Sequence, residues 1–348
     1  MKAAVSLRDI ARRARVSHVS VSNVLNRPGR AGEVSARTAA VIRKLAEEMN
    51  YVPNRSARSL SLRKTHTVVL ATNSGLHHTY VHELIEELQT ELNRNDLQLD
   101  LQLLHRVSDE ESVYRTFGPP RCDGVVILDP SPPTCARLKR MRPLGVPVII
   151  VGAESDLGFP SVDYDRVEAI RMGVAHLLER GHTRVAMVVD AEAGIRRTQR
   201  LQGYRAAVRG AGFAFDRTLV VPWLVGSDAN GLWAAISALR PMPTGVFLYN
   251  DELAAGLLHA IRREGLRVPD DVAIVTQINS RLTRLVEVPL TAVDSNYREI
   301  AREVVGILQE NAGSEAGGNP RRQVSVRPIL FERESSGGTL RMSRNAVS

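Results

Sequence analysis

The first fifty residues repeat apolar positions at intervals of three and four, which predicts three short amphipathic helices. Their apolar stripes are, in chain order, Leu7, Ile10, Ala11 and Ala14; Val21, Val24 and Leu25; and Val41, Ile42, Leu45, Ala46 and Met49. Ser6, Ser17 and Ser35 precede the stripes, where a hydroxyl can cap the first turn of a helix. Two short helices joined by a tight turn and followed by a supporting helix are typical of a helix-turn-helix domain.

Beyond residue 66, apolar runs of strand length alternate with longer helical stretches. Strands are predicted over residues 67–71, 97–103, 124–128, 146–151, 185–189, 245–249 and 272–276, and helices over residues 81–93, 166–180, 199–211, 232–239 and 252–264. This alternation favours parallel sheets covered by helices. We therefore expect an N-terminal all-α helix-turn-helix headpiece followed by an α/β body of two Rossmann-like lobes. A ligand of such a body binds beyond the carboxyl ends of the strands.

The distribution of charge separates these two parts of the chain. Residues 1–65 contain 14 lysines and arginines against 4 acidic residues, whereas the remainder contains 32 against 34. A positive field concentrated on a helix-turn-helix favours nucleic acid as the partner. A three-helix bundle that binds nothing is the alternative interpretation. Of the whole chain, 4% is aromatic, so the core must be aliphatic.

Other features narrow the class of protein. We find no apolar run of the ~18 residues that a membrane span needs, and charges interrupt the N-terminal segment, as they would not in a secretory leader. The two cysteines, Cys122 and Cys135, are too few for a disulfide framework or a four-cysteine zinc site. We therefore expect a cytoplasmic protein. The sequence shows no convincing metal-ligand set and no nucleophile–base motif, so we expect neither a metal, a cofactor nor an enzymatic activity.

Several headpiece residues are suited to DNA. The second helix carries small polar side chains near its start, where they can reach base edges in the major groove, and Ser6 and Ser17 mark helix N-termini that can hold phosphates. A short basic helix over residues 54–65, with Leu60 exposed, suits insertion into the minor groove, although a flexible basic linker is the default interpretation.

These stretches resemble the LacI/GalR family of bacterial transcription regulators. The matching segments are LRDIARRARVS (residues 7–17), VSNVLN (21–26) and YVPNRSARSL (51–60). The resemblance implies that the family's base-reading positions fall on His18, Val19 and Asn23, and that its hinge leucine is Leu60, inserted at the centre of a near-palindromic operator. Arg15 stands where a turn glycine is common in the family. The candidate DNA contacts are Ser6, Ser17, His18, Val19, Ser20, Asn23, Asn26, Asn54, Arg55, Arg58 and Leu60.

The resemblance extends through the body. It is carried by AHLLERGHTRVA (residues 175–186), RLQGY (200–204), NDELAAG (250–256) and VPDDV (268–272). It implies a periplasmic-binding-protein-like pair of lobes with a small-molecule effector bound between them, and a sugar or derivative is the candidate class. Arg200 and Asn250 are then the leading effector contacts, because a guanidinium and an amide bind hydroxyls or carboxylates. Tyr80 on the opposite wall and Gln277 complete the candidate set, with His78 as a weaker candidate.

Ile278 departs from the family pattern, because it occupies the place of an aspartate that grips the effector. An aliphatic side chain accepts no hydrogen bond. Three explanations remain open: the effector is not a typical sugar, other groups compensate, or the effector site has been lost.

The resulting domain prediction is a helix-turn-helix domain over residues 1–53, a hinge helix and linker over 54–65, an effector-binding and dimerisation body over 66–334, and a disordered tail over 335–348. We expect a homodimer, because a two-fold operator requires one. The function predicted is a sequence-specific DNA-binding regulator, most naturally a repressor, whose operator affinity is modulated by a small molecule. A small-molecule-binding protein of similar fold, or a regulator without effector control, is the alternative.

Overall fold

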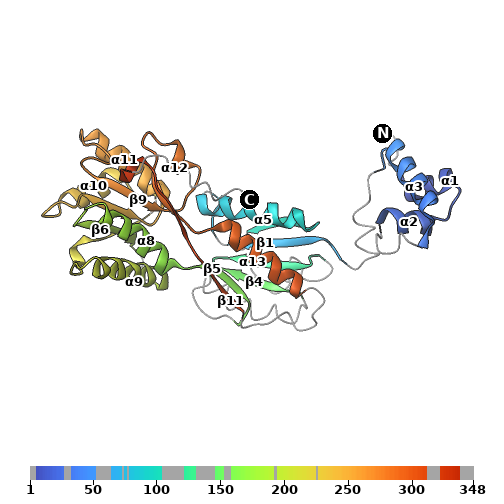
Figure 1. The fold of residues 1–348 in the computed structure, drawn as a ribbon, viewed down its shortest axis with the longest axis horizontal. Coiled ribbons are helices and arrows are strands. Elements are labelled where there is room, and N and C mark those ends of the chain that lie inside the picture. The colour runs from blue at the N-terminus through green and yellow to red at the C-terminus, as the bar shows by residue number, and fades with distance from the viewer. Residues whose placement is uncertain are drawn as a thin grey trace. The chain divides into compact units, whose positions relative to one another are not determined.

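The computed structural model describes most of the chain in two compact units, residues 1–66 and 67–348. The described residues are 5–26, 33–51, 64–72, 74–76, 78–103, 121–130, 146–152, 158–191, 194–224, 226–311 and 322–337. Each unit is built around its own apolar core. Figure 1 shows the helices and strands of both units.

The N-terminal unit packs three helices around one small core. They are α1 (Leu7–Ala14), α2 (His18–Asn26) and α3 (Ala36–Glu48). Ile10, Val21 and Ile42 are fully buried at their meeting point. The predicted three-helix headpiece is therefore present. Val41, which was expected on the buried stripe of the third helix, is instead 46% exposed, and Ala39 takes the inward position.

The turn between α1 and α2 depends on Arg15. This residue ends α1 with φ 54°, in the left-handed region that non-glycine residues seldom occupy, and its N–H donates to the carbonyl of Ala11. A glycine would adopt this conformation without steric cost. The turn therefore holds its shape although the glycine expected by family resemblance is absent.

The larger unit contains two lobes, each with a six-stranded sheet. The first lobe has the strand order β11-β5-β4-β3-β1-β2. Its strands are β1 (Thr67–Thr72), β2 (Gln98–Leu103), β3 (Gly124–Leu128), β4 (Val148–Val151), β5 (Ser161–Tyr164) and β11 (Gln323–Val326), all paired in parallel. Helices α5 (Thr79–Arg94) and α13 (Tyr297–Glu310) pack against it.

The second lobe has the strand order β12-β10-β9-β8-β6-β7. Its strands are β6 (Val185–Asp190), β7 (Val220–Trp223), β8 (Gly245–Leu248), β9 (Ala273–Gln277), β10 (Thr291–Asp294) and β12 (Ile329–Phe331), and only the edge strand β12 runs antiparallel. Its helices are α8 (Arg166–Glu179), α9 (Ile195–Gly210), α10 (Ala229–Ser237), α11 (Asp251–Arg263) and α12 (Leu282–Leu285), with 3₁₀ turns η4 (Arg217–Leu219) and η5 (Glu334–Ser336). The chain crosses between lobes after β5, β10 and β11.

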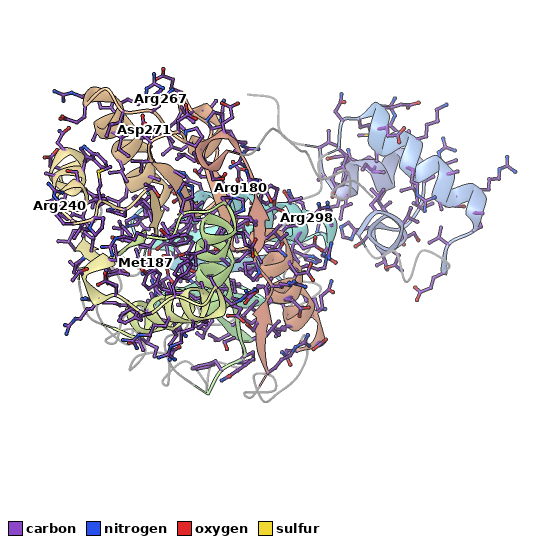
Figure 2. All side chains as sticks on the ribbon, turned by 60° about the vertical axis from the view of Figure 1, so that its left-hand side comes forward. Arg180, Met187, Arg240, Arg267, Asp271 and Arg298 are labelled. Atoms are coloured by element: carbon purple, nitrogen blue, oxygen red, sulfur yellow. The ribbon has the colours of Figure 1, made fainter. Side chains whose placement is uncertain are left out.

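Both sheets are covered on both faces, which explains why their central strands read as continuous apolar runs. Along β6, Ala186 and Val188 enter one core while Met187 and Val189 enter the other. Met187 lies within the second lobe in Figure 2, whereas Arg240 and Arg267 lie at its surface. The expected architecture of a helix-turn-helix headpiece and two α/β lobes is confirmed.

The structure differs from the sequence prediction in the shorter elements. Strands β5, β7, β10, β11 and β12 and helix α13 were not predicted. The boundary of the tail at residue 335 is wrong. Ser335 and Ser336 are buried, because the Ser335 hydroxyl donates to the carbonyl of Ile274 (2.6 Å) and Ser336 lies 2.8 Å from Nε2 of the buried His176. Residues 338–348 lie outside the described part of the chain.

In the described residues, no helix is both long and apolar enough to cross a membrane.

A close helix pair yields a stability prediction. α8 and α9 lie side by side, and a Cβ on Gly203 would stand 2.3 Å from the carbonyl oxygen of Val167. Gly203→Ala must therefore separate the helices, and we expect a loss of about 1–3 kcal/mol in unfolding free energy, measured by urea denaturation. Gly210→Ala, in the same helix, meets nothing within 4 Å. This control should leave stability unchanged or raise it slightly, and equal effects of the two changes would contradict the steric explanation.

Candidate functional site

Two regions hold the residues that the sequence singled out, and the first is the start of each headpiece helix. The Ser6 hydroxyl accepts the Asp9 N–H (3.4 Å), and the Ser6 backbone N–H donates to the Asp9 carboxylate (3.0 Å), which completes a capping box on α1. Ser17 accepts the Ser20 N–H (3.0 Å) and so caps α2. Both serines are exposed. The N-terminal ends of α1 and α2 are therefore open to an anion, which helix N–H groups and the helix dipole attract.

The first turn of α2 presents its side chains outward. His18 is exposed, Val19 is 63% exposed, and Ser20 is half-buried beside Ser17. The exposed side chain of Val19 is large and apolar. It matches the apolar contact that a thymine methyl group accepts in the major groove.

Asn23 departs from its expected role. Its side chain is 5% exposed, and its Nδ2 donates to the Glu33 carboxylate at 2.9 Å. In this structure the burial and the hydrogen bond to Glu33 hold the amide away from the surface, so a base contact by Asn23 requires this bond to break and stays a prediction. Instead, the pair connects α2 to the segment that precedes α3.

The remaining headpiece candidates receive no test from the structure. Asn26 is the last residue of α2. Asn54, Arg55, Arg58 and Leu60 lie outside the described residues. Their roles stay predictions from the sequence.

The second region is a cavity of about 260 Å³ between the two lobes. All four effector candidates, Tyr80, Arg200, Asn250 and Gln277, line it, and so does His78. They come from separate parts of the fold: Tyr80 from the first turn of α5, Arg200 from α9, Asn250 from the start of α11 and Gln277 from the end of β9. The fold thus brings together residues that lie up to almost two hundred positions apart.

The cavity occupies the carboxyl ends of the parallel strands, where α/β folds bind ligands. Asp129 follows β3, Gly152 follows β4, Asp190 ends β6 and Ile278 follows β9, and each of them lines the cavity. Segments that cross between lobes supply further lining at Tyr164, Arg166 and Tyr297.

Three guanidinium groups in the cavity are each paired with a carboxylate. Arg196 donates to Asp129 (2.6 Å), Arg166 donates to Asp163 (3.3 Å), and Arg200 donates to Asp190. The guanidinium carbons of Arg166 and Arg200 also lie 4.5 and 4.7 Å from the ring centroids of Tyr164 and Tyr249. Because every arginine has an aspartate partner, the wall is close to neutral although it is rich in charge.

Burial controls the protonation of several lining groups. Loss of solvent raises the pKa of the Asp163 carboxyl, and the neighbouring Arg166 opposes this rise. Burial also raises the phenol pKa of Tyr80 and that of Tyr297. These phenols stay protonated at neutral pH and can donate hydrogen bonds. The Tyr80 hydroxyl donates to Ser74 at 2.7 Å.

Some buried polar atoms of the cavity have no hydrogen-bond partner among the described residues. They are Oε1 of Gln277, Nε of Arg166 and Nε of Arg200. The other end of the Gln277 amide donates to the Tyr164 hydroxyl. Buried polar groups are nearly always satisfied in native proteins. The unpartnered acceptor and donors therefore mark places where a ligand or water can bind.

The sequence prediction did not include several charged residues that line the cavity. Asp129, Asp163, Asp190, Arg166 and Arg196 line the cavity but were not among the candidates. A usable signal existed for two of them, since Asp129 and Asp190 stand at the ends of apolar strands, where ligand-binding residues gather. Among the described residues, no three histidine, cysteine or acidic side chains are arranged to hold a metal ion.

Two family models match the chain. Residues 6–54 match the model of bacterial regulatory proteins of the lacI family, and residues 174–336 match a periplasmic binding protein-like domain.

Whole-chain relatives agree with both matches. The chain is 26% identical to the HTH-type transcriptional repressor PurR of Vibrio atlanticus over 95% of its length and 98% of the relative. It is 27% identical to the HTH-type transcriptional repressor CytR of Escherichia coli, covering 94% and 95%. A solved structure of the lac repressor dimer bound to operator and the anti-inducer ONPF has a TM-score of 0.75 at 22% identity, covering 96% and 99% of the two chains, and this likeness establishes the fold.

The chain therefore combines a helix-turn-helix domain that matches the lacI family of bacterial regulatory proteins with a periplasmic binding protein-like domain, and over nearly its whole length it is similar to transcriptional repressors.

Proposed function

We propose that this protein is a dimeric transcriptional repressor that binds a near-palindromic operator. A small molecule lowers or raises its affinity for this operator. The observation that carries the proposal is the combination, in one chain, of a capped α2 in a helix-turn-helix with a cavity between two lobes that is lined by charged, polar and aliphatic side chains. Such a repressor acts in the bacterial cytoplasm, where its DNA lies, and it needs no catalytic group.

DNA recognition starts from the first turn of α2. His18 and Val19 are exposed there and are our choice for base contacts, with Ser20 beside them. Ser6 and Ser17 stand at helix N-termini that favour backbone phosphates. Asn26 and the basic segment with Asn54, Arg55, Arg58 and Leu60 complete the proposed interface on the strength of the sequence alone.

Control by the effector follows from the position of the cavity. Both lobes contribute to its lining, so a ligand that contacts both stabilises the arrangement in which they approach each other. Tyr80, Arg200, Asn250 and Gln277 are the proposed contacts. The effector can change operator affinity only by the difference between its own affinities for the two arrangements. In a two-fold dimer, the change in the arrangement of the lobes affects both headpieces.

The first prediction concerns DNA. Full-length protein should select a near-palindromic duplex from random-sequence DNA and shift it in a native gel, whereas residues 67–348 should shift none. Binding should weaken steeply with salt, because neutralised phosphates release counterions; six to ten contacts correspond to a loss of about 10³–10⁵ between 50 and 200 mM. Binding that is flat with salt, or retained without the headpiece, would exclude the proposed interface.

The second prediction concerns the effector. A thermal-shift screen against sugars, nucleosides, purines and amino acids should find a stabilising ligand, since saturation at ~100 times its Kd adds about 2.7 kcal/mol. Arg200→Ala should remove this shift and the response of the operator complex, while operator affinity without ligand stays unchanged. Arg209→Ala is the matched control, because Arg209 is exposed on the same helix and does not line the cavity. A full dose response in Arg200→Ala would refute the assignment.

A further inference from the structure

The charges of the cavity limit what it can hold. Arg166, Arg196 and Arg200 each donate to an aspartate that also lines the cavity. Because each of these positive charges is already balanced by a carboxylate, an anionic ligand would bring an unbalanced negative charge into a partly desolvated site, which is costly. The pairing therefore favours a ligand without net charge.

Ile278 is held in the cavity wall by an unusual backbone conformation. Its φ is 76°, a left-handed value that is an outlier for a β-branched residue. Its N–H donates to the Val293 carbonyl at 3.0 Å, and its side chain is 7% exposed. Strained residues persist only where the surrounding structure fixes them, and they cluster at ligand clamps. The isoleucine is therefore a fixed part of the wall.

The first lobe also contributes aliphatic side chains to the lining of the cavity. Leu128, Val151 and Ile300 belong to the core of the first lobe and also line the cavity. Aliphatic side chains thus come from both lobes, while the unpartnered Oε1 of Gln277 directly precedes Ile278 in the chain. A ligand that fits this lining has hydroxyl donors on one part and an apolar edge on another.

We propose that Ile278 is the specificity-determining residue of the effector site and selects a neutral sugar with a deoxygenated edge, a 6-deoxyhexose, over the matching hexose. The proposal rests on the proposed function and names its ligand class. A hydroxyl placed against Ile278 would lose water without gaining a hydrogen bond, whereas a methyl group would gain apolar contact. The cavity volume of about 260 Å³ lies just below the roughly 300–1,000 Å³ of sites for drug-sized ligands, which suits a monosaccharide.

The test uses matched sugars and isothermal titration of the full-length protein. The pairs are L-rhamnose with L-mannose, L-fucose with L-galactose, and D-fucose with D-galactose, whose members differ by one hydroxyl. We expect at least one 6-deoxy sugar to bind about 10–100-fold more tightly than its partner. Equal or tighter binding of every hydroxylated partner, or no binding by any of the six, would overturn the proposal.

Variants at the same position assign the preference to Ile278. Ile278→Asn places an amide in the wall, and asparagine tolerates the left-handed backbone; the preference should fall to within about threefold or reverse. Ile278→Val keeps an aliphatic branch and should retain the preference. Leu224→Asn, at a 48% exposed position outside the cavity lining, is the matched control. An unchanged ratio in Ile278→Asn would overturn the assignment, and if that variant fails to fold, a lost preference in Ile278→Val would do so.

Gel shifts of the same preparations on the selected duplex separate this proposal from the proposed function. If none of the sugars binds but DNA binding responds to another class of ligand, the ligand class proposed here is wrong, whereas the proposed function as a repressor still holds. If DNA binding itself fails, the proposed function is wrong whatever the sugars do.

Discussion

A buried carboxylate joins the two lobes beside the cavity. Asp251, the first residue of α11, is fully buried and accepts hydrogen bonds from Thr79 of the first lobe (2.8 Å) and from Ser280 of the second. Burial raises the pKa of this carboxyl, and the two hydrogen bonds oppose the rise. The helix dipole at the start of α11 adds to the stabilisation of its charge. His78 and Asn250, the neighbours of this pair in the chain, line the cavity. The Thr79–Asp251 hydrogen bond therefore joins the two walls, together with the Arg196–Asp129 ion pair and the Gln277–Tyr164 hydrogen bond.

The stretch from Arg200 to Tyr204 links the cavity to the packing of the second lobe, because its residues have three different roles on one helix. Arg200 reaches the cavity and its partner Asp190, Gly203 allows α8 to approach, and the Tyr204 hydroxyl anchors the helix to the sheet through the Val185 carbonyl at 2.8 Å. Moving α9 away from α8 would therefore also move a cavity arginine. The spacing of this motif follows from helix geometry, because residues three and four apart share a face.

The limits of the sequence prediction have physical causes. Strands such as β6 and β9 were predictable because burial on both faces leaves only apolar residues, whereas β5 mixes a serine and an aspartate with apolar residues because it ends at the cavity. The four effector candidates could be predicted by family resemblance. The pairing of Arg196 with Asp129 could not, because an ion pair between residues 67 positions apart leaves no periodicity in the sequence. The hydrogen bond between Asn23 and Glu33 could not be predicted either, because Glu33 lies in another segment.

The free energy that such a switch requires is modest. Allosteric coupling of 5–150-fold corresponds to about 1–3 kcal/mol, and a hydrogen bond contributes about 0.5–1.5 kcal/mol net. Two or three bonds made in only one arrangement of the lobes are therefore sufficient. Oε1 of Gln277 and the Nε atoms of Arg166 and Arg200 are buried in the cavity without partners among the described residues. Since the charged ends of these arginines are already neutralised, their unpartnered N–H groups can bind a ligand without any ion pair being broken.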